Sequence, residues 1–410
     1  MKLSDIAEFI TDKISSSSIS LDNYVTTDSL LQNKRGRELA QNLPPMQCAL
    51  TNYKKGDVLV ANIRPYLKKV WFADSKGGCS SDVLVFRAKN EHYPSFLYAI
   101  LMQDAFFDYA MLGAKGSKMP RGDKNQIMRY ELPTFTSAEE ENIGNIMVDV
   151  ISKINVNRQI NDNLEAMAKQ LYDYWFVQFD FPNEEGKPYK SSGGAMVYNE
   201  KLKREIPQGW HCYELNKWLE IKSGFAFKSE TYISKGKFKV VTIKNVQDHH
   251  LDTSSCDYVY EIPQGMKEWC SLSVNDRLIS LTGNCGRLCI VTEKDLLLNQ
   301  RVGLLACNDE YIDYAYLLLS SEEYQTLSNN LAKGAAQANL SPVDLCKNIA
   351  VLPKLDVLEK FNRQIKPIVA SYIQNEIQIA ELTKQRDELL PLLMNGQASV
   401  NYNLSHFRVK

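Results

Sequence analysis

The feature that most constrains this chain is a repeat of its own sequence, in which the second half follows the pattern of the first. Asp57 in KGDVLVANIR corresponds to Asp276 in VNDRLISLTG, a shift of 219 (276 − 57). A shift of 218 (332 − 114) relates Ala114-Lys115-Gly116 to Ala332-Lys333-Gly334. A nearly constant shift maintained over roughly eighty positions indicates one architecture present twice, and such long-period repeats decide the fold class of a chain.

Each copy opens with short β-like runs separated by glycine-bearing turns. Residues 58–63 and 83–87 of the first copy have counterparts in residues 277–281 and 302–306 of the second. A helical stretch follows in both copies, immediately before the Ala-Lys-Gly loop. We therefore expect two mixed α+β domains.

A long amphipathic helix is expected after each of these domains. Ser137 followed by Glu140 has the form of a capping box, and apolar residues then recur at spacings of three, four and seven. The seam predicted for the helix pair comprises Ile146, Val150, Asn157, Ile160, Leu164, Leu171, Ile365, Ile368, Asn375, Ile379, Leu382 and Leu389. The two helices are expected to pack antiparallel, with Pro367 kinking or restarting the second. Asn157 and Asn375 either fix the register of the pair or lie on a solvated face.

These patterns give a complete segmentation. The first domain spans 1–136 and its helix 137–178, a Pro-, Gly- and Ser-rich linker spans 179–206, the second domain 207–354, its helix 355–396, and a tail 397–410. The predicted fold class is α+β: two tandem mixed α/β domains joined by two long antiparallel coiled-coil-like helices, with a pseudo-twofold internal repeat.

Composition excludes several classes of protein. Hydrophobic content is 44%, charged content 24% and net charge −1, with no uninterrupted apolar run of eighteen residues, so a membrane span is not expected. Nine cysteines without a CxxC pair indicate reduced thiols in a cytoplasm. No nucleotide cradle, metal-ligand spacing or catalytic motif is present. We therefore expect no catalytic residues and no metal site, and hence a protein that is not an enzyme.

The stretch LGAKGSKMPRGDK, residues 112–124, is the strongest local concentration of positive charge. It contains three glycines and four basic residues. Because the net charge is close to zero, a nucleic-acid site would have to rest on such a local field. The alternative interpretation is an ordinary solvated loop.

Several longer stretches resemble one known family. INDNLEAMAKQLYDYWFVQFDFPNEEGKPYKSSGG (160–194) and IPQGW (206–210) resemble the central helix, the exit linker and the start of a recognition domain in the DNA-specificity subunit of type I restriction–modification systems. GDVLVANIRPYLKKVWFADSKGGCSSDVLVF and NDRLISLTGNCGRLCIV resemble the target recognition domains of that family.

This resemblance implies a function and a set of partners. Each recognition domain would read one half of a bipartite site in double-stranded DNA, while the helices set the gap and dock two methyltransferase subunits. S-adenosylmethionine, ATP and magnesium would be bound by partner subunits, including a restriction and translocation subunit, and this chain would hold no cofactor. The alternative from another class is a non-catalytic protein–protein adaptor with duplicated domains.

The predicted DNA-binding residues follow from the basic loop, its repeat and the neighbouring turns. They are Arg64, Lys68, Lys69, Lys115, Ser117, Lys118, Arg121, Lys124, Arg287, Asn299, Gln300, Arg301, Lys333, Gln337 and Asn339. Lysines are expected to neutralise phosphates, Arg121 or Lys124 to reach a guanine edge, and Gln337 or Asn339 an adenine edge.

Overall fold

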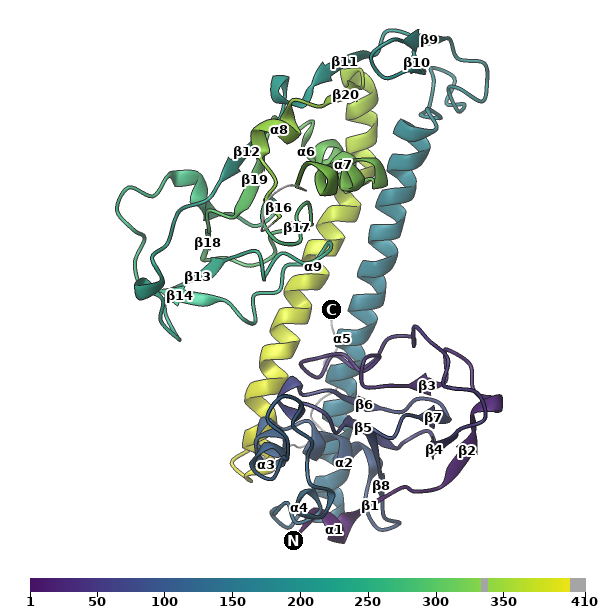
Figure 1. Ribbon diagram of the computed structural model, residues 1–410, viewed down its shortest axis with the longest axis vertical. Helices are drawn as coiled ribbons and strands as arrows, with labels where there is room; N and C mark the ends of the chain where they lie inside the picture. Colours follow the sequence, from purple (N-terminus) through teal and green to yellow (C-terminus); the bar gives the residue numbers. More distant parts are fainter. Residues whose placement is uncertain (333–337, 399–410) are drawn as a thin grey trace. The chain divides into compact units, whose positions relative to one another are not determined.

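A computed structural model describes residues 1–332 and 338–398 (Figure 1). The chain forms two compact units. Unit 1 comprises residues 1–156 and the C-terminal segment from Ala380, and unit 2 comprises Asn157–Ile379. The boundary falls inside the two long helices, α5 (Ser137–Tyr172) and α9 (Leu355–Met394), so each helix contributes to both units. The two compact units therefore differ from the segments expected from the sequence, in which each long helix is a segment of its own.

Unit 1 contains two four-stranded sheets. One is antiparallel with the order β1-β8-β5-β6, formed by β1 (Ala7–Phe9), β8 (Val83–Ala88), β5 (Val58–Ala61) and β6 (Val70–Phe72). The other has the order β2-β4-β7-β3, formed by β2 (Lys13–Ser15), β4 (Ala49–Tyr53), β7 (Gly77–Cys79) and β3 (Tyr24–Val25), and its β3–β7 pair is parallel. Short helices α1 (Leu3–Ile6) and α4 (Lys124–Ile127) flank them.

Helix α2 (Pro94–Leu101) packs between the first sheet and α5, and α3 (Asp104–Leu112) follows it in the chain (Figure 1). Residues 96–101 are all buried, because α2 packs within the core shared by the sheet and α5. The contact with α5 is close: a Cβ added at Gly144 would lie 2.6 Å from the backbone nitrogen of Phe96. Glycine is therefore required at that position, and Met147 and Ile151 extend the same buried face of α5.

Unit 2 repeats the first sheet of unit 1 strand for strand. Its order is β12-β19-β16-β17, with β12 (Glu220–Ser223), β19 (Val302–Ala306), β16 (Arg277–Ser280) and β17 (Leu288–Ile290). Helices α6 (Ile312–Ser320), α7 (Glu322–Ala332) and α8 (Pro342–Cys346) follow. A two-stranded sheet of β11 (His211–Glu214) and β20 (Ile349–Leu352) completes this part of the unit.

The second sheet of unit 2 differs from its counterpart at one edge. Its order is β14-β13-β18-β15, with β14 (Asp257–Val259), β13 (Phe238–Val241), β18 (Leu296–Leu298) and β15 (Ser271–Leu272). The parallel β13–β18 pair and the antiparallel β15–β18 pair correspond to β3–β7 and β4–β7. The fourth strand pairs with β4 in unit 1 but with β13 in unit 2, so the two domains share a core and differ in their outer strand.

The predicted linker is ordered by aromatic packing. A π-helical turn, Asp173–Val177, ends α5, and a hairpin of β9 (Met196–Asn199) and β10 (Arg204–Pro207) follows. Phe181 stacks on Tyr189 and Trp210, with ring centroids 4.6 and 4.9 Å apart. These contacts hold the segment against the core of unit 2.

Within unit 2, α5 and α9 pack antiparallel through polar residues. Asn157 donates to the Gln378 carboxamide oxygen at 3.2 Å, and Asn161 donates to the Glu376 carboxylate at 2.7 Å. Asn375 donates to Asn161 at 3.0 Å. Asn157 and Asn375 therefore face the partner helix rather than solvent, where buried amides can specify register.

The predicted seam needs one correction. Ile365 and Ile379 are buried, and Ile146, Val150, Leu164, Leu171, Ile368, Asn375, Leu382 and Leu389 are half-buried. Ile160, in contrast, is 41% exposed. The inward face of α5 passes through Ile154, Asn161 and Ala168, so contact between the helices uses small and polar residues that an apolar-spacing search does not select.

Two smaller expectations also change. The capping box is formed by Thr136 and Glu139, which exchange hydrogen bonds between side chain and backbone amide at 2.8 and 3.3 Å. Glu140 is buried instead and bonds His92 at 2.9 Å. Pro367 is exposed within α9, and the helix continues through it, so the second helix does not restart at this residue.

Candidate nucleic-acid interface

In unit 1, the glycine-rich basic loop closes on itself between α3 and α4. Lys115 and Arg121 exchange two backbone hydrogen bonds of 2.9 Å in a short antiparallel bridge. Gly116 has a φ of +96°, a conformation that strains any side chain. Asp123 then accepts from two backbone amides of α4 at 2.9 and 3.1 Å, and these bonds hold the pKa of its carboxyl below the ordinary value. Ser117 and Lys118 consequently lie at the exposed tip of a closed loop.

The loop is anchored to two turns of the β1-β8-β5-β6 sheet. The Arg64 amide donates to the Pro120 carbonyl at 2.7 Å, and the Gly122 amide donates to the Asn62 carbonyl at 3.2 Å. The Asn62 amide in turn donates to the Asp82 carbonyl at 2.8 Å. The basic loop, the turn after β5 and the turn before β8 therefore form one connected surface.

Unit 2 contains the same three hydrogen bonds at the repeat-equivalent positions. Gly283 donates to Ala338 at 3.0 Å, Leu340 donates to Leu281 at 2.7 Å, and Leu281 donates to Arg301 at 2.9 Å. Each donor and acceptor is displaced from its counterpart by the shift of the repeat, which is 219 for the first donor (283 − 64) and 218 for its acceptor (338 − 120). Arg64 and Gly283 also share a left-handed backbone, with φ of 52° and 76°. The two units thus hold the equivalent segments 120–122 and 338–340 on equivalent turns.

Side chains on this surface of unit 1 are mainly cationic and exposed. Arg121 is 59% exposed and lies 3.1 Å from the Asp82 carboxylate, and Lys115 is 86% exposed at 3.6 Å from Asp123. Arg64, Lys118 and Lys124 are exposed. Within residues 1–332 and 338–398, none of these last three has an ion-pair partner, so they are available to an anionic ligand.

Two other predicted lysines are tied to the fold. Lys68 forms an ion pair with Asp104 at 2.9 Å. Lys69 donates to the Thr27 carbonyl at 2.5 Å, and burial lowers the pKa of its ammonium group. The structure therefore favours the loop cations over these two as ligand contacts.

The equivalent surface of unit 2 carries different side chains. Gln300 and Arg301 are exposed at the turn before β19, and Asn299 donates to the Tyr232 hydroxyl at 3.3 Å. The Asn339 carboxamide oxygen accepts from the Thr282 hydroxyl at 3.0 Å, and the residue is exposed. Arg287 is held by Gln247 at 3.0 Å and by Asp248 at 3.3 Å. Lys333 and Gln337 lie outside the described residues.

Sequence reasoning missed Asp82, the acid that holds Arg121. The signal was present in the repeat, because Asp82 aligns with Arg301 and Arg121 aligns with Asn339. The Asp82–Arg121 ion pair of unit 1 is thus replaced in unit 2 by Arg301 and Asn339. Tyr66, beside Arg64 and 51% exposed, was also not selected.

Other kinds of site are not found in the described parts of the chain. Among residues 1–332 and 338–398, no group of three or more His, Cys, Asp or Glu side chains could hold a metal ion. No helix in these ranges is long and apolar enough to cross a membrane.

Comparison with known proteins bears on this arrangement. The family model described as the type I restriction modification DNA specificity domain matches residues 1–166 and 207–386, one match in each repeat. The chain belongs to this family. Its matched segments together cover most of the sequence and coincide with the duplicated architecture.

Individual family members are similar over most of their length. The chain is 25% identical to the type I restriction enzyme MjaIX specificity subunit of Methanocaldococcus jannaschii, covering 86% of this chain and 80% of that protein. It is 22% identical to the HindI specificity subunit of Haemophilus influenzae, covering 91% and 94%. The crystal structure of the type I restriction–modification S subunit from M. genitalium shares the fold, with a TM-score of 0.59 and 16% identity over 96% of this chain and 95% of that one.

Proposed function

We propose that this chain is the DNA-reading subunit of a type I restriction–modification complex, in which each β-rich domain reads one half of a two-part sequence. The observation that carries the proposal is the repeated anchoring of the segment that follows Ala-Lys-Gly, residues 120–122 in unit 1 and 338–340 in unit 2. The same three backbone hydrogen bonds hold this segment in both units, while the side chains at equivalent positions differ. A common scaffold with two sets of side chains meets the requirement for reading two unlike half-sites of a duplex.

In the first domain, charge and geometry suit guanine and phosphate. Arg121 presents a planar fork of donors whose orientation the Asp82 carboxylate restrains at 3.1 Å, and a bidentate arginine contact to guanine is the commonest specific pairing in the major groove. Lys115, Lys118 and Lys124 surround it on the loop and can neutralise phosphates, which fixes position without reading sequence.

In the second domain, the equivalent surface favours amide readout. Asn339 replaces Arg121, and Gln300 and Arg301 replace Ser81 and Asp82. A carboxamide can donate and accept at once, which matches the N6 and N7 edge of adenine, and the Asn339 oxygen keeps a second lone pair beside the bond from Thr282. The exposed Arg301 can contact phosphate or guanine. The two half-sites are therefore expected to differ in sequence.

Apolar side chains on one face of the long helices, alternately exposed and half-buried, are suited to docking partner subunits. On α5 and its terminal turn in unit 2, Ile160, Leu164, Met167, Leu171 and Tyr174 recur at spacings of four and three, and Ile160, Met167 and Tyr174 are 41%, 51% and 38% exposed. We call these five residues the docking stripe. Such a heptad-spaced stripe is the surface that a partner helix buries in a coiled coil.

The stripe has a counterpart on α9 in unit 1. Leu382, Leu389 and Leu392 correspond to Leu164, Leu171 and Tyr174 at a constant shift of 218 (382 − 164), and Leu392 is 42% exposed. One docking face in each repeat accounts for two methyltransferase subunits. We assign the methyl donor, ATP and magnesium to the methyltransferase and restriction subunits of such a complex, and the unread gap in the DNA to the length of the shared helices.

The proposal is tested by selecting bound sequences from randomised duplex DNA with the chain complexed to the methyltransferase subunits of its system. The parent complex should retain two fixed blocks of bases separated by a gap of constant length. Exchanging one pair, with Asp82→Arg and Arg121→Asn, installs the side chains of unit 2 in unit 1 and should change one block only. Arg129→Ala, an exposed arginine outside the loop, is the matched control. Retention without any preferred sequence by the parent complex would refute the proposal.

A further inference from the structure

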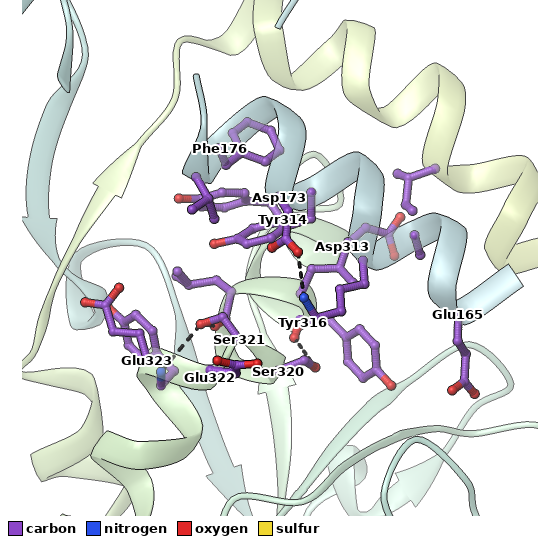
Figure 2. A pocket seen from close by; sticks show the side chains of 18 of the residues that line it. Glu165, Asp173, Phe176, Asp313, Tyr314, Tyr316, Ser320, Ser321, Glu322 and Glu323 are labelled. Atoms are coloured by element: carbon purple, nitrogen blue, oxygen red, sulfur yellow. Dashed lines mark hydrogen bonds and ion pairs between the residues drawn. The ribbon is translucent and has the colours of Figure 1, made fainter. Parts of the chain in front are cut away.

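Unit 2 contains a cavity of about 670 Å³ between α5, the α6–α7 junction and α9 (Figure 2). Its walls include buried aromatic side chains, among them Tyr172, Phe176, Tyr314 and Tyr316. A volume of this size is typical of a ligand site rather than of a packing defect, and the walls of this cavity combine aromatic side chains with charged groups. The cavity is separate from the loop surface described above.

Carboxyl groups outnumber cationic groups in the lining of this cavity. Six carboxylates line it, against the two cations Lys169 and Arg204. Two of the six are already paired, Asp313 with Arg277 and Asp173 with Lys169, both at 2.6 Å. In the part of the chain that the structure describes, four carboxylates remain outside such pairs (6 − 2 = 4), namely Asp162, Glu165, Glu322 and Glu323. Carboxylates in this lining therefore outnumber cations.

In unit 1, a lysine lies at the position that corresponds to the α6–α7 junction of unit 2. Asp104 begins α3 as Glu322 begins α7, and the two positions are related by the repeat shift of 218 (322 − 104). The Lys34 ammonium lies 2.7 Å from Asp104 and 3.4 Å from Asp387 on α9. Lys34 is 7% exposed, so a buried alkylammonium group bridges the short helix and the long helix.

The corresponding loop of unit 2 places His249 in the lining of the cavity, but burial lowers the pKa of this imidazole, so the loop supplies no permanent cation there. The bridge Val246↔Leu251 corresponds to Leu30↔Arg37, and His249 takes the same left-handed conformation as Lys34, with φ of 60° and 61°. The next residue, His250, pairs with Glu376 on α9 at 3.3 Å. The loop therefore engages α9, and Glu322 and Glu323 on α7 are left without a cation from it.

The cavity is continuous with the docking stripe. Leu164 belongs to the stripe and also lines the cavity. Glu165 and Lys169, which are close to the stripe on α5, line the cavity too. We propose that this cavity receives a lysine or arginine side chain carried by the methyltransferase helix that docks on the stripe. This inference rests on the proposed docking function and adds that a cationic side chain of the partner, which we call the anchor, enters the cavity.

Docking of a cation in the cavity should change the protonation of Glu165. Burial raises the pKa of Glu165 to about 8, with Asp162 and Glu376 adding to the increase and Tyr372 opposing it. A cation entering the cavity would favour the ionised carboxylate. Docking should therefore release a proton near pH 7, which calorimetry in buffers of different ionisation enthalpy detects.

The test compares the affinity of full-length variants for the methyltransferase subunit of the same system. Glu322→Gln with Glu323→Gln removes two exposed charges at nearly constant volume and should weaken binding roughly ten- to a hundredfold, with a shallower salt dependence. Asp309→Asn with Glu310→Gln is the matched control, because this exposed adjacent pair does not line the cavity. Thermal unfolding of each variant verifies that the fold is retained.

A docking variant separates failure of this inference from failure of the docking function. Met167→Asp places a charge in the middle of the stripe and should abolish binding. Loss of binding in Met167→Asp with parent affinity in the Glu322/Glu323 variant would overturn the anchor and leave the docking function intact. Parent affinity in both variants would overturn docking itself. Stabilisation of the free chain by butylamine, with no effect of the Glu322/Glu323 variant on partner affinity, would identify a small-amine site and also overturn the anchor.

Discussion

Replacing Arg121 with alanine should relax base choice at one position of one half-site and leave the fold intact. Arg121 is 59% exposed, and it forms an ion pair with Asp82 at 3.1 Å. Exposed ion pairs contribute about 0–1 kcal/mol to folding stability. The free energy of unfolding should therefore change by no more than that amount.

The expected effect on recognition is larger. A bidentate arginine–guanine contact contributes about 1–3 kcal/mol of discrimination against the wrong base. At about 1.4 kcal/mol per factor of ten, this corresponds to a loss of specificity of roughly five- to 150-fold at a single base pair. Lys118, at the tip of the same loop, is expected to contact phosphate. Lys118→Ala should therefore lower the affinity for all DNA sequences alike, and it should reduce the slope of log K against log salt concentration by about 0.9.

The assay is competition binding of the assembled complex to the selected site and to its single-base variants, at several salt concentrations. Arg121→Ala should equalise affinities at one base pair while preserving discrimination at every other position. Lys118→Ala should preserve discrimination everywhere. Equal loss of affinity for all sequences in Arg121→Ala would show that Arg121 contacts phosphate, and parent behaviour in both variants would refute the assignment of the loop to DNA.

Three further predictions concern stability and are measured by denaturant unfolding. Asp313→Ala leaves the Arg277 guanidinium, 1% exposed, without its carboxylate and should destabilise the protein by about 3–5 kcal/mol, whereas a change below about 1 kcal/mol would contradict a structural role for the pair. Thr136→Ala removes the cap that Glu139 completes and should cost about 0.5–2 kcal/mol, with an unchanged midpoint being the contrary result. Glu165 has a pKa of about 8 in the folded protein against 4.5 when unfolded, so the folded state holds its proton more tightly and stability should fall as pH rises from about 4.5 to 8. Glu165→Gln should flatten this decline, and an unaltered slope would show that other groups cause it.

The outer edge of the second sheet is the part in which the two domains diverge most. Strand β2 precedes β3 in the chain and pairs with β4, whereas β14 follows β13 and pairs with it. The shared strands carry most of the buried apolar residues of both copies, whereas the outer strand contributes one buried residue in unit 2, Val259 of β14, and none in unit 1. Divergence at an edge strand changes the domain surface without disturbing the loop anchors.

The heptad pattern of α5 illustrates how a correct observation led to a partly wrong placement. Ile160, Leu164 and Leu171 do recur at coiled-coil spacing, as predicted, but Ile160 faces solvent. The contact with α9 is made by Asn157 and Asn161, through hydrogen bonds of 3.2 and 2.7 Å. Spacing alone identifies a stripe that needs a partner, but it does not say whether that partner belongs to the same chain.

The sequence by itself determined the duplication, the two α+β domains and the long helices, because periodicity and a nearly constant shift are properties of the residue order. It also located the basic loop, since local charge and glycine content need no neighbours to be recognised. Only the tertiary structure decided that Lys68 and Lys34 serve the fold while Lys118 and Lys124 stay exposed, and that Asp82 restrains Arg121. The physical reason is that the role of a charged side chain depends on which groups lie within a few ångströms of it, and those groups come from distant parts of the chain.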